Sequence, residues 1–169
     1  MNAVAFTAFR DPLKKKSGVF LYFLEVTDRW RVSDVENLLP MIDYHIIRLF
    51  CRTGCLEIQD ESLRQKLRSK ELATDEEERV LRQASFQIHL QLGKVFDVPE
   101  RGELLYLLSR SYCRNTPVSI SGNLPENDSF DLYTETTFHG ACPLQKWCPG
   151  ACQAQYRDLW EPTIQTENY

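Results

Sequence analysis

One long amphipathic segment limits the possible fold more than any other feature of this sequence. TDEEERVLRQASFQIHLQLGK (residues 74–94) opens with Thr74 and Glu77 at the spacing of a helix capping box, and acidic residues fill its first turn. Apolar residues then recur at helical intervals and predict a buried stripe of Val80, Leu81, Ala84, Ile88 and Leu92. This segment is therefore predicted to be the clearest helix of the chain.

Start and stop signals predict further helices. An Asp-Pro pair opens a helical pattern over residues 11–26. Residues 33–40 begin with a capping-box pattern and end at a proline. The segment DYHIIRLFCRTG (residues 43–54) begins with Asp43, a good N-cap residue, and ends with Gly54, a typical C-terminal stop.

Two more helices are expected at residues 60–70 and 101–113, and no segment alternates as a strand would. The predicted fold class is all-α: a compact helical domain with a C-terminal cysteine-rich loop. Three parts are expected. They are a helical domain over residues 1–113, a polar loop insertion over 114–138, and a Cys/His loop with a tail over 139–169.

Composition limits the class of protein. Hydrophobic residues make up 43% and charged residues 26% of 169 residues, which suits one globular domain with its own core. The net charge of −4 argues against strong non-specific binding to nucleic acid. Basic residues are nevertheless concentrated in the first third of the chain, where an anionic partner would bind.

The N-terminal segment favours an intracellular protein, cytoplasmic or nuclear. Its basic cluster follows a weak apolar stretch, whereas a secretory signal has the opposite order. Mean hydropathy is −0.40, and no apolar run approaches the roughly 18 residues of a membrane span, so no membrane association is expected.

The six cysteines raise the question of a metal site, because clustered cysteines in a reducing compartment are often metal ligands. Three of them lie in HGACPLQKWCPGAC (residues 139–152), which reads as H-x2-C-x5-C-x3-C. Prolines restrict this loop, and its glycines let backbone N–H groups approach the sulfurs. Two interpretations stay open: a bound metal or cluster, or free cysteines that pack as small hydrophobic residues.

The stretch PMIDYHIIRLFCRTGCLEI (residues 40–58) resembles a segment of the helix-hairpin-helix DNA glycosylase superfamily, especially its endonuclease III branch. The resemblance implies that Asp43 caps a helix and is also the catalytic carboxylate. A second stretch, LLSRSYCRNTP (residues 107–117), resembles the segment that carries the first cysteine of that family's iron–sulfur loop. By this comparison Cys113 is a cluster ligand.

The same resemblance implies the other ligands. It assigns a [4Fe–4S] cluster, with zinc as the alternative metal, to Cys113, His139, Cys142 and Cys148, with His139 in place of a cysteine and Cys152 as a competing fourth ligand. The gap of 25 residues after Cys113 is longer than the family's, and the LPGxG hairpin and the preceding helical domain are missing. The chain therefore resembles a partial member, and a partner chain could supply the missing helical part.

The segment DPLKKKSGVFLYFL (residues 11–24) is similar to the lysine-bearing helix of archaeal 8-oxoguanine glycosylases. This similarity implies that Lys16 is the amine nucleophile that forms a Schiff base, with a carboxylate to stabilise the developing charge. The residues expected to hold DNA are Lys14, Lys15, His45, Arg48 and Arg52.

Two functions follow. The first is a base-excision N-glycosylase/AP lyase, or a degenerate relative that binds damaged or abasic DNA. The alternative is a non-catalytic, metal-stapled helical module that binds nucleic acid or a protein partner.

Overall fold

The computed structural model describes residues 11–34, 37, 39–96, 105, 106, 108, 109, 113 and 142–165. In these residues the chain is helical and forms no sheet; residues 72 and 163 make an isolated β-bridge. The all-α class is therefore confirmed for the described part of the chain. The helices are α2 (Lys15–Val26), α3 (Tyr44–Thr53), α4 (Glu61–Ser69), α5 (Asp75–Phe96), α9 (Pro149–Cys152) and α10 (Ala154–Arg157).

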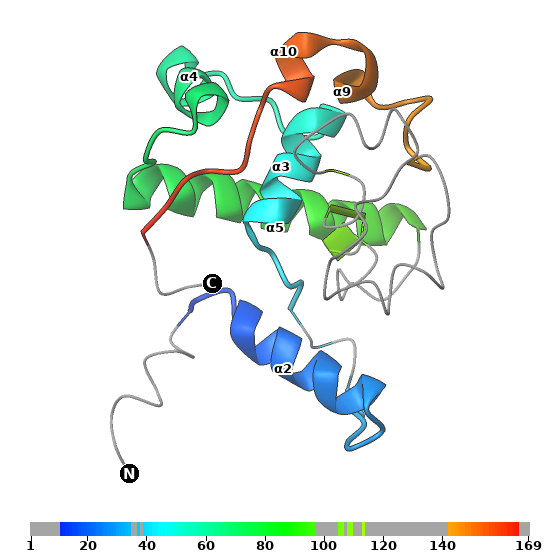
Figure 1. Cartoon of the computed structure of the whole chain (residues 1–169). Coiled ribbons are helices and arrows are strands. Elements are labelled where there is room, and N and C mark those ends of the chain that lie inside the picture. Colours follow the sequence, from blue (N-terminus) through cyan, green and yellow to red (C-terminus); the bar gives the residue numbers. More distant parts are fainter. Residues whose placement is uncertain are drawn as a thin grey trace.

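Helix α3 is the centre of the fold. It packs across the long helix α5 on one side and contacts the short helices α9 and α10 on the other, while α2 lies apart at the N-terminal end (Figure 1). The main core cluster packs residues of α4, α5 and the C-terminal segment around α3, and its members are Ile47, Cys51, Ile58, Leu67, Leu81 and Leu159. A second cluster is built on Ile42, Ile46 and Phe50.

The predicted ends of α3 are confirmed. The Asp43 side chain accepts hydrogen bonds from the backbone N–H groups of His45 (2.9 Å) and Ile46 (3.1 Å), which otherwise have no partner within the helix. At the other end, Gly54 adopts a left-handed conformation with φ 75°.

The capping box of α5 is also confirmed. Glu77 N–H donates to the Thr74 hydroxyl (3.2 Å), and Thr74 N–H donates to the Glu77 carboxylate (2.7 Å). The predicted buried stripe is only partly right, because Val80 is 49% exposed whereas Leu81 is 2% exposed. Relative to the predicted stripe, the buried face of α5 is rotated about the helix axis, so that it includes polar residues: Glu78, Arg82, Ser85 and His89.

Helix α2 begins later than the Asp-Pro pair predicts. Both carboxylate oxygens of Asp11 accept backbone N–H groups, from Leu13 (3.1 Å) and Lys15 (2.9 Å), and Lys14 turns into a left-handed conformation with φ 55°. Asp11 is also buried against Arg82 of α5. The first residues therefore form a capping turn, and the helix starts at Lys15.

The other predicted elements have mixed outcomes. The helix predicted over 60–70 is confirmed as α4, which Asp60 caps through the Leu63 N–H (2.9 Å). In the segment 33–40, residues 35, 36 and 38 lie outside the described part. The helix predicted over 101–113 has only residues 105, 106, 108 and 109 described as helical. The insertion 114–138 lies outside the described residues.

Residues 157–165 form what we name the C-terminal strap, which runs between α3 and α4, passes over α5 and is coloured red in Figure 1. Backbone hydrogen bonds fasten it: Trp160 N–H donates to Leu67 O (3.2 Å), and Ala73 N–H donates to Thr163 O (2.8 Å). Leu159 of the strap belongs to the main core cluster. The strap thus contributes Leu159 to the interior, while most of its side chains stay at least partly exposed.

Among the described residues, no helix has both the length and the apolar character that crossing a bilayer requires.

Candidate thiol site

Three cysteines from two segments lie near the C-terminal end of α3; we call Cys113, Cys142 and Cys148 the thiol site. The Cys113 Sγ lies 4.0 Å from Nη1 of Arg52, and the Cys148 thiol donates to the Arg52 carbonyl oxygen at 3.5 Å. Cys142 packs with Cys113 beside the cluster of Leu49 and Leu108. The structure therefore brings together three of the five predicted ligands.

Two of the sulfurs lie in turns of backbone N–H groups. The backbone N–H groups of residues 144 and 145 oppose the rise in the pKa of Cys142, and those of Gly150 and Ala151 oppose the rise in the pKa of Cys148. The N–H groups of Gln145 and Ala151 donate to the carbonyl oxygens of Cys142 and Cys148 (3.0 Å each). N–H groups that face a sulfur stabilise its anionic form.

Gly150 is needed because the loop approaches α3 closely. A Cβ added at Gly150 would lie 3.0 Å from the Arg52 carbonyl oxygen and 3.1 Å from the Arg52 Cβ. The absence of a side chain lets α9 pack directly on α3. This contact holds Cys148 next to Arg52.

Burial favours the protonated thiols of Cys142 and Cys148 in the absence of a metal. Burial raises the pKa of Cys142, and the neighbouring Cys113 and Cys148 raise it further. Burial also raises the pKa of Cys148, while the backbone N–H groups and the Arg52 cation oppose this effect. Metal binding at these residues would therefore displace protons.

The donor set fits a soft metal by its chemistry, since thiolates suit zinc and iron–sulfur clusters. Within the described ranges, however, no three Cys, His, Asp or Glu side chains already surround a point where an ion could bind. Cys152 is exposed, and its thiol donates to the Pro149 carbonyl oxygen at 3.5 Å. His139 lies outside the described residues.

The other two cysteines are separate from the site. Cys51 is fully buried in the main core cluster, and burial raises the pKa of its thiol to about 12. Cys55 is exposed. Cys51 therefore packs as a core residue, and Cys55 offers a matched control for cysteine substitutions.

The two arginines predicted to hold DNA lie inside the molecule. Arg48 is 2% exposed; its guanidinium donates to the Glu161 carboxylate (2.5 Å) and to the Ser109 carbonyl oxygen (3.0 Å). Arg52 is 7% exposed and donates from Nε to the Leu159 carbonyl oxygen (2.9 Å). Their role in DNA binding stays a prediction, and in this arrangement both serve internal partners.

The predicted catalytic residues lie at the other end of α3. Asp43 is 2% exposed and is used as the N-cap, while Lys16 is half-buried in the first turn of α2. Helix α2 packs closely on the segment before Asp43, because a Cβ added at Gly18 would lie 2.9 Å from Cγ of Met41.

The remaining predicted DNA-binding residues lie around the same end of the molecule. Lys14 is exposed and Lys15 is half-buried at the start of α2. The His45 ring packs against Tyr44, with ring centroids 4.1 Å apart. Their roles also stay predictions.

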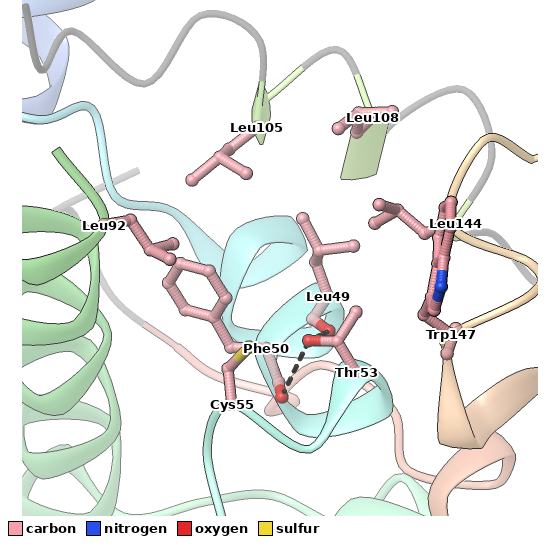
Figure 2. Close-up of a pocket in the computed structure, with 10 residues that line it drawn as sticks. Leu49, Phe50, Thr53, Cys55, Leu92, Leu105, Leu108, Leu144 and Trp147 are labelled. Carbon is pink, nitrogen blue, oxygen red and sulfur yellow. Dashed lines mark hydrogen bonds between the residues drawn. The ribbon is translucent and has the colours of Figure 1, made fainter. Parts of the chain in front are cut away.

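An apolar cavity of about 300 Å³ lies next to the thiol site. Figure 2 shows leucines 49, 92, 105, 108 and 144 turned toward it, with Trp147 at one side. The Thr53 hydroxyl lines the cavity but donates to the carbonyl oxygens of Leu49 (2.9 Å) and Phe50 (3.3 Å). The described lining therefore offers few polar groups to read the edge of a base.

Sequence reasoning missed the residues that pair with the buried arginines. Glu161 pairs with Arg48, and Asp11 pairs with Arg82. One signal was present: arginine recurs within helices whose neighbouring positions are apolar, which predicts a buried cation in need of a carboxylate.

The chain matches no protein family, no curated protein and no solved structure. The similarity to DNA glycosylases thus stays a prediction, and function has to be argued from the site.

Proposed function

We propose that this chain is a helical module that a thiolate-bound metal centre holds together and that binds DNA without catalysing its repair. The observation that carries the proposal is the proximity of Cys113, Cys142 and Cys148 beside α3, where Cys113 and Cys148 contact Arg52. The centre is a [4Fe–4S] cluster, with zinc as the alternative. The fourth ligand is His139 or Cys152.

The backbone supports this assignment. Backbone N–H groups near Cys142 and Cys148 oppose the rise in the pKa that burial causes, which favours thiolates at these two positions. A centre here would tie the segment that ends at Cys113 to the loop of α9. The buried, capping role of Asp43 and the apolar walls of the cavity favour a binding role over catalysis.

Metal and acid-labile sulfide analysis of anaerobically purified protein tests the metal centre. Iron and sulfide in equal amounts, with the visible absorption of a cluster, would support [4Fe–4S]; colourless protein with one zinc per chain would support zinc. Protein that contains neither metal and takes up neither would refute the proposal.

Cysteine variants test the ligands. Cys148→Ser and Cys142→Ser are expected to lose most of the bound metal, whereas Cys55→Ser, at an exposed cysteine outside the site, is expected to keep it. A comparison of His139→Ala with Cys152→Ser identifies the fourth ligand. Equal metal content in Cys55→Ser and Cys148→Ser would contradict the assignment.

DNA binding is tested by fluorescence anisotropy with duplexes that contain an abasic site, at several salt concentrations. Replacing Lys14, Lys15 and Lys16 by Gln is expected to weaken binding and to make its salt dependence less steep, because fewer counterions are released. Lys94→Gln, at an exposed lysine near the end of α5, is the control. If no duplex binds, a protein partner replaces DNA in this proposal.

Base excision is the second candidate function, and the packing of α2 against the segment before Asp43 favours it. That packing brings the elements that carry Lys16 and Asp43 together. Borohydride trapping on an abasic duplex is the test: an adduct that Lys16→Ala abolishes would support lyase chemistry. Absence of any adduct would leave the non-catalytic module.

A further inference from the structure

The two buried arginines of α3 join the same two segments of the chain. Arg48 donates to Ser109 O on one side and to Glu161 on the other. One helical turn later, Arg52 lies 4.0 Å from the Cys113 sulfur and donates to Leu159 O. Each arginine therefore connects the segment that ends at Cys113 with the C-terminal strap.

Trp160 of the strap lies at the end of this connection. Arg52 stacks over its ring, 4.9 Å from the centroid, and Nζ of Lys70 lies 3.6 Å from the same centroid. The Trp160 backbone N–H donates to Leu67 O. A change in the position of Arg52 or of the strap would therefore change the surroundings of this indole.

We propose that the arginine pair couples the thiol site to the strap, so that metal binding at the site tightens the docking of residues 157–165. This inference rests on the proposed metal centre. A neutral thiol is a weak acceptor, whereas a metal-bound thiolate makes a charge-assisted hydrogen bond. Metal binding at the site would strengthen the contact between Cys113 and Arg52. Arg52 in turn holds the strap through its hydrogen bond to Leu159 O.

The coupling must act in both directions, because linkage between two binding events is reciprocal. If metal tightens the strap, then a strap that binds its arginine partners well must raise the affinity for metal. Glu161 is the strap residue that allows this test, since its side chain is 26% exposed and pairs with Arg48. A change at Glu161 leaves the three cysteines and Arg52 in place.

The experiment uses the full chain with Trp30→Phe and Trp147→Phe, at two exposed positions, so that Trp160 is the tryptophan observed. Co²⁺ is added to metal-free protein, and its thiolate charge-transfer absorption reports binding. We expect Co²⁺ to shift Trp160 emission and to slow tryptic cleavage after Arg157 several-fold. In Arg52→Gln, saturating Co²⁺ is expected to leave emission and cleavage unchanged.

Glu161→Gln gives the reciprocal measurement and keeps the test decisive if Arg52→Gln fails to fold. Its Co²⁺ affinity is expected to fall by roughly 5-fold or more, the lower end of common coupling effects. Asp158→Asn is the matched control, because it removes an exposed carboxylate of the same strap and should leave affinity unchanged.

Two results would overturn the coupling: a full Trp160 response to Co²⁺ in Arg52→Gln, or equal Co²⁺ affinity in Glu161→Gln and Asp158→Asn. A Co²⁺ spectrum without any Trp160 response in the parent protein would also overturn it, while leaving the metal site intact. Absence of Co²⁺ binding by the parent protein, together with absence of iron and sulfide from the anaerobically purified protein, would instead refute the metal centre on which the coupling rests.

Discussion

Polar side chains occupy interior positions of α5 that apolar residues commonly fill in a helical protein. Ser85 is fully buried, and His89 is 2% exposed. Burial of such groups costs free energy, and for an ionisable group the cost falls on the charged form. The interior of this chain is therefore sensitive to pH at individual residues.

His89 gives the clearest pH dependence. Burial lowers the pKa of its imidazole from 6.5 to about 4, so the unfolded chain binds a proton at a pH where the folded chain does not. The contribution of the neutral His89 to the free energy of unfolding is fully present above pH 6.5 and is lost as the pH falls toward 4. Between pH 7 and pH 5 we expect the free energy of unfolding to fall by about 2 kcal/mol through His89.

Urea unfolding at both pH values measures this effect, with His89→Gln as the comparison. The variant should show a smaller fall in the free energy of unfolding between pH 7 and pH 5 than the parent protein. An identical pH dependence in the two proteins would contradict a buried neutral imidazole.

At the scale of elements, helices α3 and α4 both begin with an aspartate N-cap, but one cap is buried and the other lies at the surface. Asp43 caps α3 inside the protein, and Asp60 caps α4 at the surface. We expect Asp43→Ala to lower the free energy of unfolding by about 2 kcal/mol, and Asp60→Ala by about 0.5–1 kcal/mol. The larger effect follows because the N–H groups at Asp43 would be left buried without an acceptor.

Urea denaturation of the two variants at pH 7 compares these caps directly. Equal losses of stability would show that burial adds nothing to the Asp43 cap.

Helix ends could be predicted from the sequence because capping acts over only a few residues. The Asp43 cap, the Gly54 stop and the Thr74 capping box all depend on neighbours within four positions. The buried face of α5 could not be predicted in the same way. It depends on the pairing of Arg82 with Asp11, which lies 71 residues earlier.

The candidate site, too, could be predicted from the sequence only in part. The spacing predicted that Cys142 and Cys148 would gather, and the resemblance to DNA glycosylases added Cys113; these three lie near one another in the structure. Arg48 and Arg52, however, were expected to face DNA. Their inward orientation depends on strap residues 113 and 107 positions later, which no local pattern reveals.

At the scale of the whole molecule, one buried ionic network attaches the N-terminal segment to the body. Asp11 pairs with Arg82, and Arg82 also lies 3.6 Å from Glu78; all three residues are buried. Removal of one charge from such a network leaves the others without full compensation. The attachment of the segment before α2 to α5 therefore depends on Asp11.

We expect Asp11→Asn to lower the free energy of unfolding by about 3 kcal/mol. Asp28→Asn is the matched control, because Asp28 pairs with Arg31 at 3.4 Å on the surface and should cost at most about 1 kcal/mol. Urea denaturation at pH 7 measures both variants. Similar losses in the two would contradict a buried network.

The strap also has a consequence for biosynthesis. Arg48 and Arg52 receive partners from Glu161 and Leu159, which the ribosome adds 113 and 107 residues later. At about 5–20 residues per second, this interval is on the order of ten seconds. During that time the nascent chain carries two cations at positions that become interior only when the strap arrives. Completion of this core is therefore a late event of translation, and a chain interrupted before residue 159 would expose α3 to chaperones and proteases.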